Sequence, residues 1–114
     1  MKYFKEEEFK RCSPACEISD MDFNFLHILE SIREVSGVPM ILCSAFRSSE
    51  YDKRKGRSGK GYHTLGRAVD IRCVDGASRA KLISASLLHN CSVGVYPTFL
   101  HIDNRAKCIV FYGK

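Results

Sequence analysis

The stretch GYHTLGRAVDIRCV, residues 61–74, joins a glycine-containing loop to a predicted strand. Apolar and polar residues alternate after the loop, and Ala68, Val69 and Ile71 suit a strand that is mostly buried. His63 lies before this strand and Asp70 lies within it, seven residues further on. Imidazole and carboxylate groups are both ligands that zinc accepts, so these two side chains are candidates for a shared metal site.

The segments on either side predict an α+β fold. Apolar residues recur with a helical period over residues 20–35, and Gly37 follows as a stop signal. Residues 38–46 form a short apolar run that indicates a buried strand, and a basic, glycine-containing loop occupies residues 48–62. Downstream, the pattern predicts a helix over residues 77–90 and strands over residues 92–96, 99–103 and 107–113. This order predicts a small antiparallel sheet covered by two helices.

The composition indicates one globular domain over residues 1–114. Hydrophobic residues make up 45% of the chain, and no tract is of low complexity. No apolar run approaches the length of about 20 residues that a membrane span requires. The N-terminal MKYFKEEEFKRC has no apolar segment after its charges. We therefore expect neither a membrane span nor a signal peptide.

The net charge of +5 favours an anionic partner such as a nucleic acid or a cell-wall polymer. Much of the positive charge lies in residues 47–63, without the interleaved aromatic residues of a surface that stacks bases. A solvated loop is the simplest interpretation of this segment, and a loop that attracts an anionic substrate is the alternative. Nucleic-acid binding is the weakest of the three interpretations and is not expected.

Six cysteines occur in the chain without forming paired CxxC motifs. They are Cys12, Cys16, Cys43, Cys73, Cys91 and Cys108. Cys43, Cys73 and Cys108 lie in apolar stretches, where a free cysteine behaves as a small buried hydrophobe. Cys12 and Cys16 are close enough in sequence for a disulfide or for half of a metal site. Without a secretion signal, reduced thiols are the expected state.

Two of the four histidines have contexts that favour structural roles. His27 lies inside the first predicted helix between apolar neighbours, so we expect it to be partly buried. His89 ends the second predicted helix, where an imidazolium interacts favourably with the carbonyl end of the helix dipole. Neither histidine is a favoured metal ligand.

His101 differs from these two histidines because it alternates with apolar residues in the predicted strand FLHID. It should therefore point to the same sheet face as Asp103. If this strand pairs beside residues 67–74, His101 can converge on His63 and Asp70. A catalytic zinc ion needs three protein ligands and one open position, which this group could provide.

The motif His63-x-x-Gly66-x-Ala68-x-Asp70, followed at a distance by a strand histidine, resembles the zinc site of the M15 family of peptidases. This is the D-alanyl-D-alanine carboxypeptidase and endolysin group, whose fold is shared with the hedgehog signalling domain. Upstream, YFKEEEFKRC, LHILESIREVSGVPM and CSAFRS resemble the N-terminal portion, the helix and the Ser-x-x-Arg strand end of small phage and bacterial members of the M15A branch. The resemblance covers residues 3 to about 111.

The resemblance implies one zinc ion held by His63, Asp70 and His101, with water as the fourth ligand. Such a centre lowers the pKa of the bound water and polarises a scissile carbonyl. Arg47 matches the family arginine that holds the substrate carboxylate or the carbonyl oxygen, a role that suits a planar and permanently charged guanidinium. Ser44 is its neighbour in the Ser-x-x-Arg pattern. A surface ion pair with an acidic neighbour is the alternative for Arg47.

Two positions depart from the family pattern. Gly61 stands two residues before the first zinc histidine, where relatives often have serine. Thr98 stands three residues before the last one, where many M15 enzymes have the acidic residue that acts as general base. Asp103 is the nearest acidic candidate. It could act as the catalytic base, orient His101, or pair with Arg105, and the sequence leaves these three roles open.

Two functions follow from this resemblance. The first is a zinc peptidase that cuts stem peptides of bacterial peptidoglycan, as a D-Ala-D-Ala carboxypeptidase or an endopeptidase. A phage-encoded lysis or entry enzyme suits this function. It would be made in the host cytoplasm and act at the cell wall, or be carried in the virion. The alternative is a catalytically inactive binding module of the same fold, which zinc stabilises.

Overall fold

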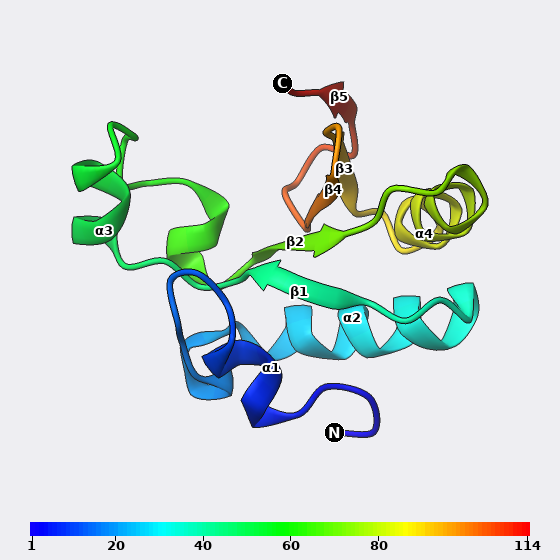
Figure 1. Cartoon of the computed structure of the whole chain (residues 1–114), viewed down its shortest axis with the longest axis horizontal. Helices are drawn as coiled ribbons and strands as arrows, with labels where there is room; N and C mark the ends of the chain where they lie inside the picture. The colour runs from blue at the N-terminus through cyan, green and yellow to red at the C-terminus, as the bar shows by residue number, and fades with distance from the viewer.

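The computed structural model describes all residues 1–114, as helices packed against one sheet (Figure 1). The helices are α1 (Glu6–Lys10), α2 (Phe23–Ser36), α3 (Ser49–Arg54) and α4 (Gly76–Leu88), with short 3-10 turns η1 (Ile18–Asp20) and η2 (Tyr62–Leu65). The strands are β1 (Ile41–Ser44), β2 (Ala68–Arg72), β3 (Ser92–Val95), β4 (Phe99–Asp103) and β5 (Val110–Tyr112). The predicted α+β class is confirmed. None of the helices is both long enough and apolar enough to cross a membrane.

The strands are arranged in the order β1-β2-β4-β3-β5. The pairs β1 with β2, β2 with β4, and β3 with β4 are antiparallel, as the sequence predicts. Strand β5 instead runs parallel to β3. The chain leaves β4, passes β3 and joins the far edge of the sheet, so its last strand has the same direction as β3. The sheet is therefore mostly, but not entirely, antiparallel.

Alternation along the central strands divides the sheet into an apolar face and a polar face. Val69 and Ile71 of β2, together with Leu100 and Ile102 of β4, are fully buried and belong to one core cluster. Helices α2 and α4 lie next to each other and cover this face (Figure 1). They contribute Phe25, Leu29, Ile32, Leu82 and Ala85 to the same cluster. The polar face is left for the candidate site.

Side-chain caps define where the two long helices begin. The carboxylate of Asp22 accepts a hydrogen bond of 2.9 Å from the backbone N–H of Phe25 at the start of α2. Asp75 accepts an equivalent bond of 2.9 Å from Ser78 at the start of α4, which lowers the pKa of the Asp75 carboxyl. The helices predicted over residues 20–35 and 77–90 therefore exist, with boundaries set by these caps.

Two short helices were not expected from the sequence. The segment predicted as a loop over residues 48–62 contains α3, whose first turn is capped by Ser48 through a 3.1 Å bond from the N–H of Tyr51. Near the N-terminus, α1 packs the fully buried Phe9 into the core cluster. Both helices are only one or two turns long, so they lack the repeated apolar spacing that marks a longer helix.

All six cysteines are free thiols in the structure. Cys73 is buried as predicted, but Cys43 and Cys108 are exposed, so the prediction for these two is wrong. Cys43 lies at an irregularity in edge strand β1, and Cys108 lies in the irregular connection before β5. Cys12 and Cys16 are both buried and do not form a disulfide.

The predicted environment is wrong for His27, whereas His89 lies at the end of its helix as predicted. His27 is exposed rather than partly buried, because it lies on the same outward face of α2 as the exposed Phe23, whose ring centroid is 4.5 Å away. His89 follows α4 as predicted, and its Nδ1–H donates a 2.7 Å hydrogen bond to the carbonyl oxygen of Ala85. The same carbonyl also accepts a 3.3 Å hydrogen bond from the backbone N–H of His89, so the imidazole adds a second bond at the end of the helix.

Candidate active site

One row of paired residues across the polar face forms the base of the candidate site. Asp70 of β2 pairs with His101 of β4, which in turn pairs with Gly94 of β3. Ser44 of β1 lies opposite Asp70, and Phe111 of β5 lies beside Gly94. Directly paired residues project from the same face of a sheet. The pairing on which the convergence of His101 and Asp70 depends is therefore present, and it places these two side chains together.

His63 reaches this row from η2, the turn that leads into β2. The turn ends at Gly66, whose backbone is left-handed with φ of 67°. A Cβ at Gly66 would lie only 2.6 Å from the carbonyl oxygen of Asp20, so glycine is required by both conformation and space. The Gly66 carbonyl accepts a 2.9 Å hydrogen bond from the N–H of Asp22, which fixes the turn against the start of α2.

The donor atoms of His63, Asp70 and His101 point toward one another. Oδ1 of Asp70 lies 3.3 Å from Nε2 of His63 and 3.1 Å from Nδ1 of His101. One donor atom from each residue lies within 4.8 Å of the other two. Tetrahedral zinc, with bonds of about 2.0–2.1 Å, separates its ligand atoms by about 3.3 Å. The two separations from Asp70 match this spacing, and the third lies within 4.8 Å, so the three side chains fit the zinc ion that the resemblance implies.

Each imidazole uses its other nitrogen to donate a hydrogen bond. Nδ1–H of His63 donates to the carbonyl oxygen of Ala45 at 2.6 Å, and Nε2–H of His101 donates to Oδ2 of Asp103 at 2.7 Å. The carbonyl and carboxylate oxygens can only accept, so these contacts set the tautomers of the neutral rings. In this tautomer, Nε2 of His63 and Nδ1 of His101 carry the lone pairs that a metal ion beside Asp70 would bind; where these nitrogens carry protons instead, they donate hydrogen bonds to Asp70. Partners of this kind commonly orient histidine ligands in metal sites.

Asp103 has no exposed surface and lies behind His101. Besides the bond from His101, it accepts bonds from the backbone N–H of Arg105 at 3.0 Å and from the guanidinium Nη2 of Arg105 at 2.6 Å. The ion pair with Arg105 and the contact with His101, which the sequence presents as alternatives, are thus made together. The carboxylate does not border the cleft described below.

Hydrogen bonds outweigh burial in setting the pKa values of Asp70, Asp103 and His101. Burial alone would raise the pKa of Asp70, but the bonds from His101 and His63 hold it well below its usual range. Burial would also raise the pKa of Asp103, and the bonds from His101 and Arg105 lower it instead. For His101, burial would lower the pKa, while the bonds to Asp103 and Asp70 raise it. Both carboxylates are therefore anionic at neutral pH, and a proton and a metal ion compete for the imidazole.

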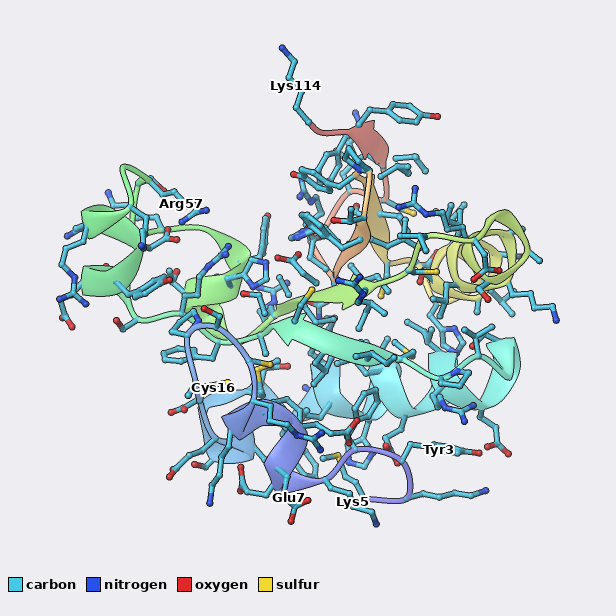
Figure 2. All side chains as sticks on the ribbon, in the orientation of Figure 1. Tyr3, Lys5, Glu7, Cys16, Arg57 and Lys114 are labelled. Carbon is cyan, nitrogen blue, oxygen red and sulfur yellow. The ribbon has the colours of Figure 1, made fainter.

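The three donor residues open onto a cleft of about 340 Å³. It is lined by Arg47, Arg57, His63, Asp70, Tyr96, Phe99, His101 and Lys114. Figure 2 places Arg57 on the turn after α3 and Lys114 at the end of the segment that follows β5. Three basic side chains, those of Arg47, Arg57 and Lys114, therefore belong to the lining, and Asp70 provides its only acidic side chain. This distribution of charge suits a substrate that carries negative charge.

Arg47 lines the cleft and also contacts an acidic neighbour. Its Nε lies 3.5 Å from Oδ1 of Asp52, a residue that is only 3% exposed. The Arg57 guanidinium lies 3.9 Å from the same oxygen. Both Arg47 Nε and Asp52 Oδ1 are buried without a hydrogen-bond partner. The buried carboxylate thus holds two guanidinium groups beside the cleft by charge, and it leaves their remaining N–H groups for other partners.

Ser44 takes a different position from that of Arg47. It is buried opposite Asp70, its Oγ has no hydrogen-bond partner, and it does not line the cleft. Four residues that do line the cleft were not identified from the sequence, namely Arg57, Tyr96, Phe99 and Lys114. The stacked rings of Tyr96 and Phe99, with centroids 4.3 Å apart, form one wall. Of these four residues, only Arg57 belongs to the basic segment 47–63, whose positive charge suggests from the sequence a loop that attracts an anionic substrate.

Comparison with known proteins gives one match. A family model described as Peptidase M15 matches residues 2–103. The match includes all three donor residues, Arg47 and Asp103, and ends before the last strand. Searches of curated proteins and of solved structures return no match.

Proposed function

Since the chain belongs to the Peptidase M15 family, we propose that it is a zinc-dependent peptidase that cleaves stem peptides of bacterial peptidoglycan. Cleavage by a carboxypeptidase or an endopeptidase mode is compatible with the proposal, and the bacterial cell wall is the proposed place of action. The net charge of +5 would favour contact with an anionic wall polymer.

One observation carries the proposal, namely the arrangement of donor atoms around Asp70. His63 and His101 each direct one nitrogen at the Asp70 carboxylate, at 3.3 and 3.1 Å, while their other nitrogens donate to Ala45 and Asp103. A zinc ion held by these three ligands would polarise a peptide carbonyl and lower the pKa of water. The residues of the chain contribute by fixing the ligand geometry before any substrate binds.

The cations beside the cleft are proposed to bind substrate. Arg47 can offer its free N–H groups to a carboxylate or a carbonyl oxygen of the peptide, and Asp52 would keep the guanidinium in place. Ser44 does not reach the cleft, so its proposed part is limited to packing beside Asp70. For Asp103, full burial favours the orienting role over that of a general base, because a base must reach the reacting groups.

A binding module without turnover is the second candidate function. The observation that favours it is the lack of a second carboxylate in the cleft: Thr98 occupies the position of the usual acid, and Asp70 is the only acidic residue in the lining. A protein of this kind would bind zinc and the wall peptide but release no product.

Metal content and product release together distinguish the two functions. The purified protein is assayed for zinc, and its action on isolated peptidoglycan is followed by chromatography of released peptides, before and after a chelator. The peptidase should contain about one zinc per chain, lose activity with the chelator and regain it with added zinc. Zinc without product release would select the binding module, and absence of zinc binding would contradict both.

Substitution of Arg47 tests the proposed substrate contact. Arg47→Gln should retain zinc but reduce kcat/KM on a stem peptide by about 10-fold or more, the loss expected for one charged hydrogen-bond partner. Arg54→Gln is the matched control, because Arg54 is an exposed cation of α3 that does not line the cleft. Equal activity of the two variants would remove Arg47 from the proposed mechanism.

A further inference from the structure

The segment formed by residues 104–114, here called the C-terminal segment, lies beyond the part of the chain that the family model matches. It nevertheless contacts the candidate metal site at several points. Arg105 bonds to Asp103, Phe111 packs beside His101, and Lys114 lines the cleft. The segment contains β5, which completes one edge of the sheet (Figure 1). These contacts are therefore made by a part of the chain that lies outside the matched residues.

Arg105 donates hydrogen bonds to both carboxylate oxygens of Asp103. Nε of Arg105 donates to Oδ1 of Asp103 at 2.9 Å, Nη2 donates to Oδ2 at 2.6 Å, and the backbone N–H of Arg105 donates to Oδ1 at 3.0 Å. Oδ2 is also the oxygen that accepts from Nε2 of His101. Arg105 thus fixes both oxygens of the carboxylate that orients the histidine.

Two aromatic rings hold the Arg105 guanidinium in this position. Its central carbon lies 5.1 Å from the ring centroid of Tyr62 and 5.1 Å from that of Phe111. Tyr62 belongs to η2 and immediately precedes His63, whereas Phe111 belongs to β5. Arg105 therefore links the turn that carries one donor residue with the strand edge beside the other, and stacking limits its motion.

Phe111 has room beside the site because residue 94 has no side chain. A Cβ at Gly94 would lie 2.5 Å from the Phe111 ring and 3.1 Å from Cβ of His101. The Phe111 ring lies 5.6 Å from the His101 ring, centroid to centroid. The same aromatic side chain thus contacts both Arg105 and the histidine that Arg105 orients through Asp103.

We propose that Arg105, held between Tyr62 and Phe111, is a positioning residue of the metal site. It fixes the Asp103 carboxylate, which in turn keeps Nδ1 of His101 directed at Asp70. The inference rests on the proposed function in one respect only, namely that His63, Asp70 and His101 bind zinc. Arg105 itself contacts neither the metal ligands nor the substrate cleft.

Zinc affinity, measured by competition with a chromophoric chelator, tests this role without depending on peptidase activity. Arg105→Gln keeps a polar side chain but loses the positive charge and the paired N–H groups of the guanidinium. It should lower zinc affinity by about 10-fold, the lower end of the range for a partner that contacts a ligand directly, because Arg105 acts through Asp103. Arg105→Lys keeps the charge and should show a smaller loss. The full chain is used, and the thermal midpoint of each metal-free variant shows that it is folded.

Arg67→Gln is the matched control. The Arg67 guanidinium also stacks on Tyr62, at 5.5 Å, but bonds to Asn104 rather than to Asp103. Its zinc affinity should stay within about 2-fold of the parent. Parent affinity in Arg105→Gln, or equal losses in both variants, would overturn the inference while leaving the proposed function intact. If the parent protein binds no zinc, the proposed function fails, and the inference fails with it.

Discussion

Asp103 lies directly behind His101, with no exposed surface and with hydrogen bonds from both His101 and Arg105. A carboxylate in this position can influence the metal without contacting it, by keeping the imidazole basic and aligned. The adjacent Ile102 points to the opposite face and belongs to the core. A single step along β4 therefore separates a residue of the site from a residue of the core.

The substitution Asp103→Asn separates the orienting role from that of a general base. The amide lacks the negative charge that the Nε2–H of His101 and the guanidinium of Arg105 both require, so zinc affinity should fall about 10- to 100-fold. Turnover at saturating zinc should change less. Asp75→Asn, at the exposed start of α4, is the control. Parent zinc affinity combined with a large loss of turnover would instead favour the general base.

Sequence reasoning placed some of these residues better than others. His63 and Asp70 share one short motif, and strand alternation put His101 on the same face as Asp103, because that alternation is a local property. Arg105 had no comparable signal. Its importance depends on rings supplied by η2 and β5, and no local pattern predicts that these two elements meet at the guanidinium.

At the scale of elements, the contact between β3 and β5 governs how closely the C-terminal segment covers the site. Gly94→Ala should place a methyl group against the ring of Phe111 and displace β5. The expected loss in the free energy of unfolding is about 1–3 kcal/mol, the range for overpacked positions, measured by urea denaturation. Zinc affinity should fall as well, because the ring also supports Arg105.

Gly76→Ala provides the comparison for this substitution. Gly76 begins α4, and a Cβ there would meet no atom within 4 Å. Alanine should therefore stabilise the protein by about 0.4–1 kcal/mol by restricting the unfolded chain. If Gly94→Ala were as stable as the parent, β5 would have to tolerate the displaced ring, and the proposed support of Arg105 by Phe111 would be weakened.

The predicted and observed elements differ where tertiary contacts decide the structure. Helices α2 and α4 are long enough to show a repeating apolar face, and Asp22 and Asp75 mark where they begin. Helices α1 and α3 are too short for such a repeat. The direction of β5 depends on which side of β3 the chain joins, and alternation within a strand carries no information about its partner.

At the scale of the whole molecule, the site and the hydrophobic core occupy opposite faces of the sheet. The core cluster of 22 residues includes none of the three donor residues. Removal of zinc by a chelator should therefore lower the thermal midpoint without unfolding the chain at room temperature. Free zinc at about 1,000 times its Kd should add about 4 kcal/mol to the free energy of unfolding.

Circular dichroism of the metal-free protein, recorded during heating with and without zinc, measures this difference. Retained helical signal at room temperature together with a lower midpoint is the expected result. Loss of that signal at room temperature would mean that the metal, rather than the core, holds the fold together. The expectation that the hydrophobic core keeps the metal-free chain folded would then be wrong.

The thiols provide an independent test of the packing. Cys43 and Cys108 are exposed, whereas the other four are buried. Burial raises the pKa of Cys91 to about 12, so its thiol stays protonated and unreactive at pH 8. A chromogenic disulfide reagent should therefore modify Cys108 and Cys43 before the four buried thiols, with Cys43 the slower of the two because burial of its sulfur raises its pKa, and all six thiols after unfolding. Rapid reaction of more than two would contradict the buried positions.

Alternation of the side chains along β2 and β4 limits how the amino-acid sequence of this protein can diverge. Val69 and Ile71 flank Asp70, and Leu100 and Ile102 flank His101, so neighbours in the chain serve opposite faces. Substitutions can alter cleft residues one at a time while the helices stay packed. An insertion or deletion of a single residue within either strand would exchange the two faces, sending a carboxylate or an imidazole into the core. Tolerated changes of length are therefore confined to the connecting segments, and the strands can diverge only by replacement.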